Sequence, residues 1–308
     1  MADVIADMLS DVPPEMGTIF LGMLAGLAAA AQLLTRRKDA AASTWLAGAD
    51  QPGKQAYEHF AAWYSVVWMG AFGVIIAAQL YEQFTEVEYL GVLGGLALPL
   101  FLQPVLAPAQ AERSLPFWKR YGFKANAWIW IYSFIGNYWY THYFFSVLKA
   151  NYTFPSWRLN YVPFCLYLAT HFYFSSYHVL SNALLRKVAT TYAAGPARWV
   201  FSALMVLCLS YATAFMETFT IAGFPYYTFE NRSMAYTVGS AFYGIYFIYS
   251  FPMFFLLDER SYGPARTLYE TVVDACGCGM LILTTLDLVR LALSIPLTIP
   301  GSLWELVH

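Results

Sequence analysis

Long apolar runs recur along the whole of this 308-residue chain. The hydrocarbon core of a bilayer is about 30 Å thick, and a helix of roughly 20 apolar residues crosses it. Hydrophobic residues make up 59% of the sequence and charged residues 12%, which separates it from soluble domains. The sequence therefore predicts an all-α, polytopic membrane helical bundle. About eight transmembrane helices are expected, at residues 17–34, 60–80, 89–108, 125–148, 163–185, 199–222, 234–257 and 272–295.

The basic residues predict how this bundle is oriented. Most Lys and Arg residues lie in four connecting segments, at 35–59, 109–124, 186–198 and 258–271. Because cytoplasmic loops carry an excess of Lys and Arg, these four segments are expected on the cytoplasmic side. Both termini and the loops "YEQFTEVEY", "KANYTFPSWRLNY" and "GFPYYTFENR" are then expected on the opposite side. The expected location is the endoplasmic reticulum in a eukaryote and the cytoplasmic membrane in a bacterium.

The sequence contains no motif for binding a nucleotide, a nucleic acid, a metal or an organic cofactor. There is no GxxxxGK phosphate-binding loop and no basic tract, so neither a nucleotide nor a nucleic acid is expected as a partner. The cysteines lie inside apolar runs, and the "CGC" at 276–278 has no neighbouring histidine or second cysteine pair. These cysteines are therefore interpreted as small buried side chains rather than as metal or redox sites. Neither a metal nor an organic cofactor is predicted, and membrane lipid is the expected surrounding.

Polar residues at helical spacing mark faces that do not belong against lipid. Positions three, four and seven apart share one face of a helix. The fourth, fifth, sixth and seventh runs each carry such a polar face. The aligned residues are Ser133, Asn137 and Thr141 beside Tyr138 and His142; Tyr167, His171, Ser175, His178 and Asn182; Ser210, Thr213, Glu217 and Thr220; and Tyr236, Ser240, Tyr243 and Ser250.

Glu217 is the most informative of these residues. A carboxylate at membrane depth costs a few kcal/mol or more, so it is expected to be paired, protonated or functional. The alternative is an acid that only hydrogen-bonds a neighbouring helix. For each histidine, a packing role is as plausible as a catalytic one. By the predicted topology, one layer contains Glu217, His142, His171, Glu82 and Glu86.

The aromatic residues add a second requirement. In "NYWYTHYFFSVLKANYTFPSW", at 137–157, aromatic rings continue through the span instead of stopping at an interfacial belt. Aromatic faces can line a site for a flat apolar ligand or stabilise a cation. An acid, imidazoles and aromatic rings together fit acid–base chemistry on a lipid-soluble substrate. A proton-coupled transporter remains the alternative on these residues alone.

Long motifs make the sequence resemble one family of sterol enzymes. They include "YEQFTEVEYL" (81–90), "GNYWYTHYFF", "YTFPSW", "THFYFSSYHVLSN" (170–182) and "SFPMFF". On these motifs the chain resembles the cycloeucalenol cycloisomerase family, the cyclopropyl sterol isomerases. The likeness begins near residue 43, so the expected division is an N-terminal extension at 1–42, with a possible extra helix, and a membrane-embedded isomerase domain at 43–308.

The resemblance implies a reaction without a redox step or a cofactor. The 9β,19-cyclopropane ring of cycloeucalenol opens to give obtusifoliol, by protonation at carbon 19 and loss of the 8β proton. Such a reaction needs a neutral acid in a dry pocket and an environment that tolerates positive charge near carbon 9.

Placement and chemistry suggest which residues contribute. Glu217 is predicted to donate the proton, with His142, His171, Glu82 and Glu86 as further catalytic candidates. The predicted substrate-binding residues are Asn137, Tyr138, Trp139, Thr141, Thr213, His178, Asn182 and Tyr243. A sterol double-bond isomerase, or a sterol-binding or transport protein without catalysis, remains as an alternative function.

Overall fold

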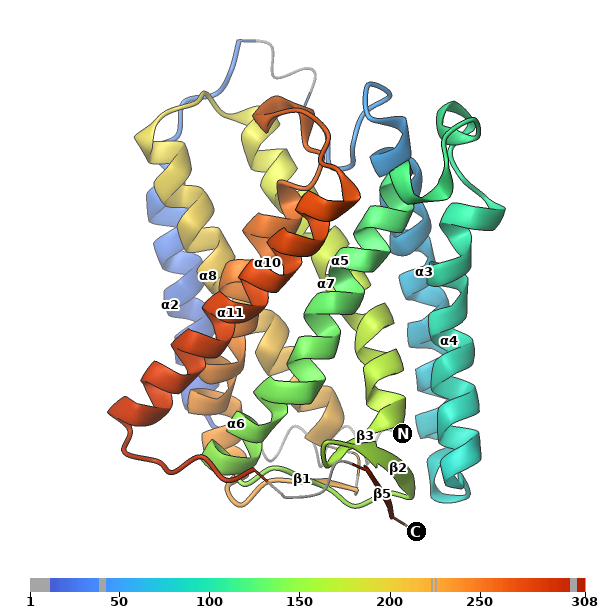
Figure 1. The fold of residues 1–308 in the computed structure, drawn as a ribbon. Coiled ribbons are helices and arrows are strands. Elements are labelled where there is room, and N and C mark those ends of the chain that lie inside the picture. The colour runs from blue at the N-terminus through green and yellow to red at the C-terminus, as the bar shows by residue number, and fades with distance from the viewer. Residues whose placement is uncertain (1–11, 39–42, 223, 225, 300–303, 308) are drawn as a thin grey trace.

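The helices of the computed structural model stand side by side in a bundle (Figure 1). It describes residues 12–38, 43–222, 224, 226–299 and 304–307. The helices are α2 (Glu15–Ala31), α3 (Pro52–Ala77), α4 (Glu86–Leu106), α5 (Tyr121–Ile135), α6 (Thr141–Val147), α7 (Phe164–Thr191), α8 (Pro196–Ala222), α9 (Arg232–Met234), α10 (Ser240–Phe255) and α11 (Leu268–Ala292). Two π-helical segments, Gly136–Tyr140 and Ala235–Gly239, join α5 to α6 and α9 to α10.

The structure supports a multi-pass helical membrane protein but does not confirm a count of about eight spans. Every predicted run is largely helical, yet five helices in the described part of the chain are long and apolar enough to cross a membrane. These spans are Pro52–Ala77, Glu86–Leu106, Pro196–Thr220, Arg232–Phe255 and Leu268–Ala292. The other runs differ for physical reasons: α2 has only 17 residues, and the stretch from α5 to α6 is rich in Tyr, Trp and polar residues, which lowers its hydropathy.

Helix α7 is long enough to span but is less apolar, because it lies inside the bundle. It contacts α3, α4, α5, α8 and α10. Its buried positions include two histidines, several serines, Asn182 and Arg186. A helix that other helices surround needs no lipid-compatible surface, so hydropathy alone underestimates it.

The N-terminal helix packs against the rest of the bundle. Phe20 of α2 makes edge contacts with Tyr211 and Phe215 of α8, at 6.1 and 5.1 Å between ring centroids. The predicted extension at 1–42 includes residues 1–11 and 39–42, which lie outside the described residues. The division into 1–42 and 43–308 therefore stays a prediction.

Short strands cover one end of the bundle (Figure 1). β1 (Asn151–Tyr152) pairs antiparallel with β4 (Tyr227–Thr228), with Tyr152 opposite Tyr227. β2 (Ser156–Leu159) lies between β3 (Val162–Pro163) and β5 (Trp304–Val307), and both pairings are antiparallel. The pairing of β1 with β4 joins two loops that are far apart in the sequence.

A buried ionic network ties the helices together at the opposite end. Arg186 on α7 bonds Glu58 on α3 and Glu259 after α10, with N···O distances of 2.7 Å to each. Lys54 bonds Glu259 at 2.9 Å and the carbonyl oxygens of Phe255 and Leu257. Burial alone would raise the pKa of Glu259, but its bonds to Arg186 and Lys54 outweigh burial and lower that pKa. Two positive and two negative charges balance, as buried charges require.

Candidate active site

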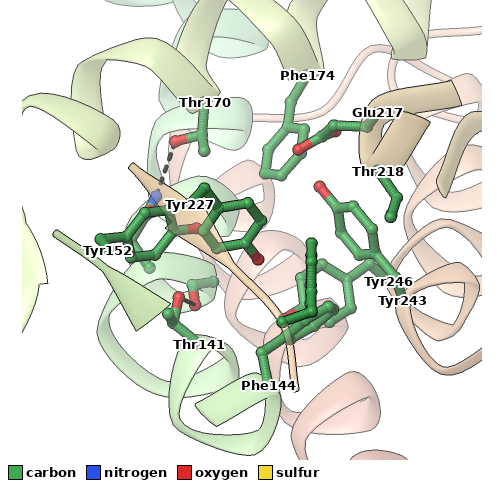
Figure 2. A pocket seen from close by; sticks show the side chains of 13 residues that line it. Thr141, Phe144, Tyr152, Thr170, Phe174, Glu217, Thr218, Tyr227, Tyr243 and Tyr246 are labelled. Atoms are coloured by element: carbon green, nitrogen blue, oxygen red, sulfur yellow. Dashed lines mark hydrogen bonds between the residues drawn. The ribbon is translucent and has the colours of Figure 1, made fainter. Parts of the chain in front are cut away.

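Two adjoining cavities lie within the bundle, toward the end that the strands cover. Their volumes are about 70 and 190 Å³. The smaller cavity lies among α6, α8, α10 and the strands β1 and β4, and the larger one among α3, α4, α7 and α8. Five residues line both of them: Asn137, Tyr152, Thr170, Glu217 and Tyr227. These five residues form the junction of the two cavities, and several of them appear together in Figure 2.

Glu217 is the acidic residue of this junction. It lies in the last turns of α8, and its side chain is partly accessible because it faces the cavities. The phenols of Tyr177 and Tyr243 interact with its carboxyl group. Its Oε2 atom is buried and has no hydrogen-bond partner among the described residues. No basic side chain lines either cavity in the described part of the chain, so the carboxyl group lacks a counter-charge there.

Asn137 enters the junction from a π-helical segment. Its Nδ2 donates to the carbonyl oxygen of Ser133 at 2.9 Å and to Thr170 Oγ1 at 2.7 Å. Figure 2 shows the bond to Thr170 as a dashed line. Both amide hydrogens are then used, while the carbonyl oxygen Oδ1 has no partner in the part of the chain that the structure describes. This oxygen can accept a hydrogen bond from a ligand hydroxyl group.

The two π-helical segments explain why these side chains reach the cavity. An extra residue in a helical turn changes which side chains face inward, and such turns are frequent at functional sites. One segment contains Asn137 and precedes Thr141, which lines the smaller cavity. The other precedes α10, whose Tyr243 and Tyr246 line the same cavity.

Paired tyrosines from the strands close the junction. Tyr152 of β1 and Tyr227 of β4 stack with ring centroids 4.4 Å apart and planes 17° apart. Burial raises the pKa of both phenols. They therefore remain protonated at neutral pH and present rings and hydroxyl groups, not charges, to the cavities.

The histidines are placed away from the cavity walls. His171 is fully buried, stacks on Phe101 at 4.0 Å, and lies 2.9 Å from Asn126 Oδ1 through Nε2. The amide nitrogen of Asn126 donates to two backbone carbonyl oxygens, so its Oδ1 accepts from His171 Nε2–H. His142 is also fully buried and lies beside Asn160. Among the described residues, neither ring nitrogen of His142 has a partner of good geometry.

His178 and Asn182, which were predicted to bind substrate, take part in packing and in the ionic network. His178 Nδ1 donates to the carbonyl oxygen of Phe174 at 2.7 Å, and aromatic rings enclose the imidazole. Asn182 Nδ2 donates to Glu58 Oε1 at 3.0 Å, at the opposite end of the bundle from the strands.

The remaining predicted residues divide into two groups. Asn137, Thr141, Glu217 and Tyr243 line the cavities. Other predicted residues are absent from the cavity walls: Glu82, Glu86, Tyr138, Trp139, Thr213, and the histidines and Asn182 described above. Glu82 is exposed, and Glu86 begins α4. Their catalytic role stays a prediction that the structure does not test.

Sequence reasoning missed several cavity residues. Thr170 and Thr218 lie on helices for which polar faces were predicted, but each is the direct neighbour in sequence of a residue chosen for the face and was not itself chosen. Tyr152 and Tyr227 lie in the short strands β1 and β4, where helical periodicity gives no signal. The one available signal was the aromatic motifs "YTFPSW" and "PYYTFENR" themselves.

The fold and the site define a class: a helical membrane protein in which two adjoining cavities, in the described part of the chain, enclose one acid among aromatic and hydroxyl side chains. No family model matches the chain, and no solved structure matches it. Cycloeucalenol cycloisomerase of Arabidopsis thaliana is 47% identical over 254 residues, covering 82% of this chain and 90% of that protein. The chain belongs to the cycloeucalenol cycloisomerase family.

Proposed function

We propose that this protein is a sterol-biosynthesis isomerase that converts cycloeucalenol to obtusifoliol by opening the 9β,19-cyclopropane ring. The name of its Arabidopsis relative and the extent of the identity support this activity. The position of Glu217 carries the chemical argument, because it is the acidic residue that both cavities share. The other side chains of the junction are an amide, a hydroxyl and two phenols.

The proposed first step is proton transfer from the neutral carboxyl group of Glu217 to carbon 19. A new C–H bond forms there as the bond between carbons 9 and 19 breaks, which leaves a cation at carbon 9. A carboxyl group without a counter-charge in a low-dielectric cavity favours its neutral form, as a proton donor requires. Aromatic faces such as those of Tyr152 and Tyr227 stabilise a nearby cation by about 0.5 to 2 kcal/mol per contact.

The proposed second step returns the proton. The 8β proton leaves to a base, and its bonding electrons form the double bond between carbons 8 and 9. Both proton transfers occur on the β face of the sterol, so the carboxylate of Glu217 can accept the proton that leaves. The substrate and the product are then isomers, and the acid is restored for the next turnover.

The test is turnover by variants of this acid. Glu217→Gln keeps the shape of the side chain but removes the acid, and we expect product formation to fall about 10²- to 10⁴-fold. Glu230→Gln is the matched control, because Glu230 is an exposed acid in the loop that follows α8. Product is measured by gas chromatography and mass spectrometry on detergent-purified protein of matched size-exclusion profile. An active Glu217→Gln protein would remove this assignment, and loss of activity in Glu82→Gln instead would transfer it to Glu82.

A further inference from the structure

The two cavities differ in the chemistry of their walls. Outside the shared junction, the smaller cavity has hydroxyl groups on Thr141, Thr218, Tyr243 and Tyr246. Outside the same junction, the larger cavity also has hydroxyl groups, on Tyr81, Tyr89, Tyr173 and Thr220, but these are four of its fourteen lining residues against four of eight in the smaller cavity. The rest of the larger cavity is lined by aliphatic and phenylalanine side chains. These include Ile75, Ile76, Val92, Leu93, Leu166 and Ala169.

A cyclopropyl sterol has the same asymmetry along its length. Its single polar group is the 3β-hydroxyl at one end, and its long alkyl chain at carbon 17 is at the other. The reacting carbon 19 lies between them, on the fused rings. The acid at the junction has the same intermediate position between the polar and the apolar cavity.

Resting on the function proposed above, we infer that the sterol lies across the junction in one orientation. Ring A, with its 3β-hydroxyl and 4α-methyl groups, occupies the smaller cavity, and the alkyl chain at carbon 17 occupies the larger one. Carbon 19 then lies beside Glu217. The opposite orientation would place the hydroxyl group in the larger cavity, where apolar side chains form most of the wall and an unpaired polar group is costly.

This orientation assigns specificity to separate residues at the two ends. Val92 on α4 lines the larger cavity, so Val92 is expected to sense the length of the alkyl chain. Thr141 on α6 lines the smaller cavity, so Thr141 is expected to sense the substituents at carbon 4. Adding bulk in a filled cavity commonly costs about tenfold or more in binding, so each end can be tested by a larger side chain.

The experiment crosses two variants with three substrates. Val92→Trp should lower kcat/KM for cycloeucalenol about tenfold or more, and a cyclosterol with its alkyl chain cut short should restore it to near the wild-type value. Thr141→Leu should discriminate further against a 4,4-dimethyl cyclosterol and should respond little to chain length. Leu98→Trp is the control for Val92→Trp, because Leu98 lies on the same helix with 51% of its side chain exposed.

The outcomes separate the inference from the function on which it rests. If Val92→Trp responded to the carbon 4 substituents and Thr141→Leu to chain length, the sterol would lie the other way round. If kcat/KM of both variants depended on the same end of the sterol, or if kcat/KM of neither variant depended on chain length or on the carbon 4 substituents, the assignment of the two cavities to the two ends would be wrong. If the wild-type protein turned over none of the three sterols, the proposed function itself would fail.

Discussion

The amide of Asn137 illustrates how a single side chain is prepared for a ligand. Bonds to Ser133 and Thr170 fix its orientation, and its carbonyl oxygen is left without a partner among the described residues, in a side chain that lines the cavities. Thr170 Oγ1 in turn bonds the carbonyl oxygen of Leu166 at 2.9 Å. A side chain held in this way loses little conformational freedom when a hydroxyl group binds, which favours affinity.

Removing this acceptor should weaken binding more than it slows chemistry. Asn137→Leu has similar bulk but cannot accept a hydrogen bond, and we expect KM to rise about tenfold with a smaller change in kcat. Thr170→Val loosens the amide but leaves its oxygen in place, so its effect on KM should be smaller. Steady-state kinetics in detergent micelles checks both variants. A normal KM for Asn137→Leu would show that the oxygen does not contact the substrate.

At the scale of elements, the ionic network shows how α3, α7 and the segment after α10 are held together. Glu259 contributes bonds to both Arg186 and Lys54. Because its pKa is lowered in the folded protein, this contribution is complete above the unfolded value of 4.5 and is lost as pH falls through the lower folded value. The melting temperature of the protein should therefore decrease as the pH is lowered below 4.5.

The variant Glu259→Gln tests the origin of this dependence. It leaves Arg186 and Lys54 with excess buried positive charge, so we expect a loss of about 3 to 5 kcal/mol in the free energy of unfolding. Its melting temperature, followed by intrinsic fluorescence from pH 7 to pH 3, should depend less on pH than that of the wild type. An unchanged pH profile would mean that other carboxylates cause the acid sensitivity.

Elements also show what the sequence could and could not reveal about the site. Helical spacing selected Glu217, Asn137, Thr141 and Tyr243, each on a helical segment with a polar face, and the structure places all four on the wall of the smaller cavity. Their catalytic and substrate-binding roles stay predictions. The same spacing identified a polar face on α7, but it did not reveal which residues pack against that face. In the structure, aromatic rings contact the imidazoles of α7. Strand pairing brings Tyr152 to Tyr227, and no local pattern predicts a contact between such distant loops.

At the scale of the whole molecule, apolar runs predicted the helical segments well and the number of spans less well. Periodicity and hydropathy see one helix at a time, whereas a helix inside the bundle, such as α7, is shaped by its neighbours. The connections at 107–120, 192–195 and 256–267 lie together at the end of the bundle opposite the strands (Figure 1). The predicted basic segments 109–124, 186–198 and 258–271 include or overlap these connections. This arrangement agrees with the alternation on which the predicted orientation rests.

That orientation predicts which loops are accessible from each side of the membrane. In sealed inside-out vesicles, the cysteine introduced by Ser114→Cys should react with a membrane-impermeant maleimide. The cysteine introduced by Thr153→Cys should react only after detergent is added. Both positions lie in segments between helices, at opposite ends of the bundle. The opposite labelling pattern would reverse the orientation without altering the fold.

The central claim is that Glu217 donates the proton that opens the cyclopropane ring. Its most direct test is a single turnover in heavy water, with enzyme equilibrated there in excess over cycloeucalenol and the product analysed by mass spectrometry. We predict obtusifoliol with one deuterium in the new methyl group at carbon 19 from the wild type, and no labelled product from Glu217→Gln on the same timescale. An unlabelled methyl group from the wild type, or labelled product from Glu217→Gln, would contradict the claim.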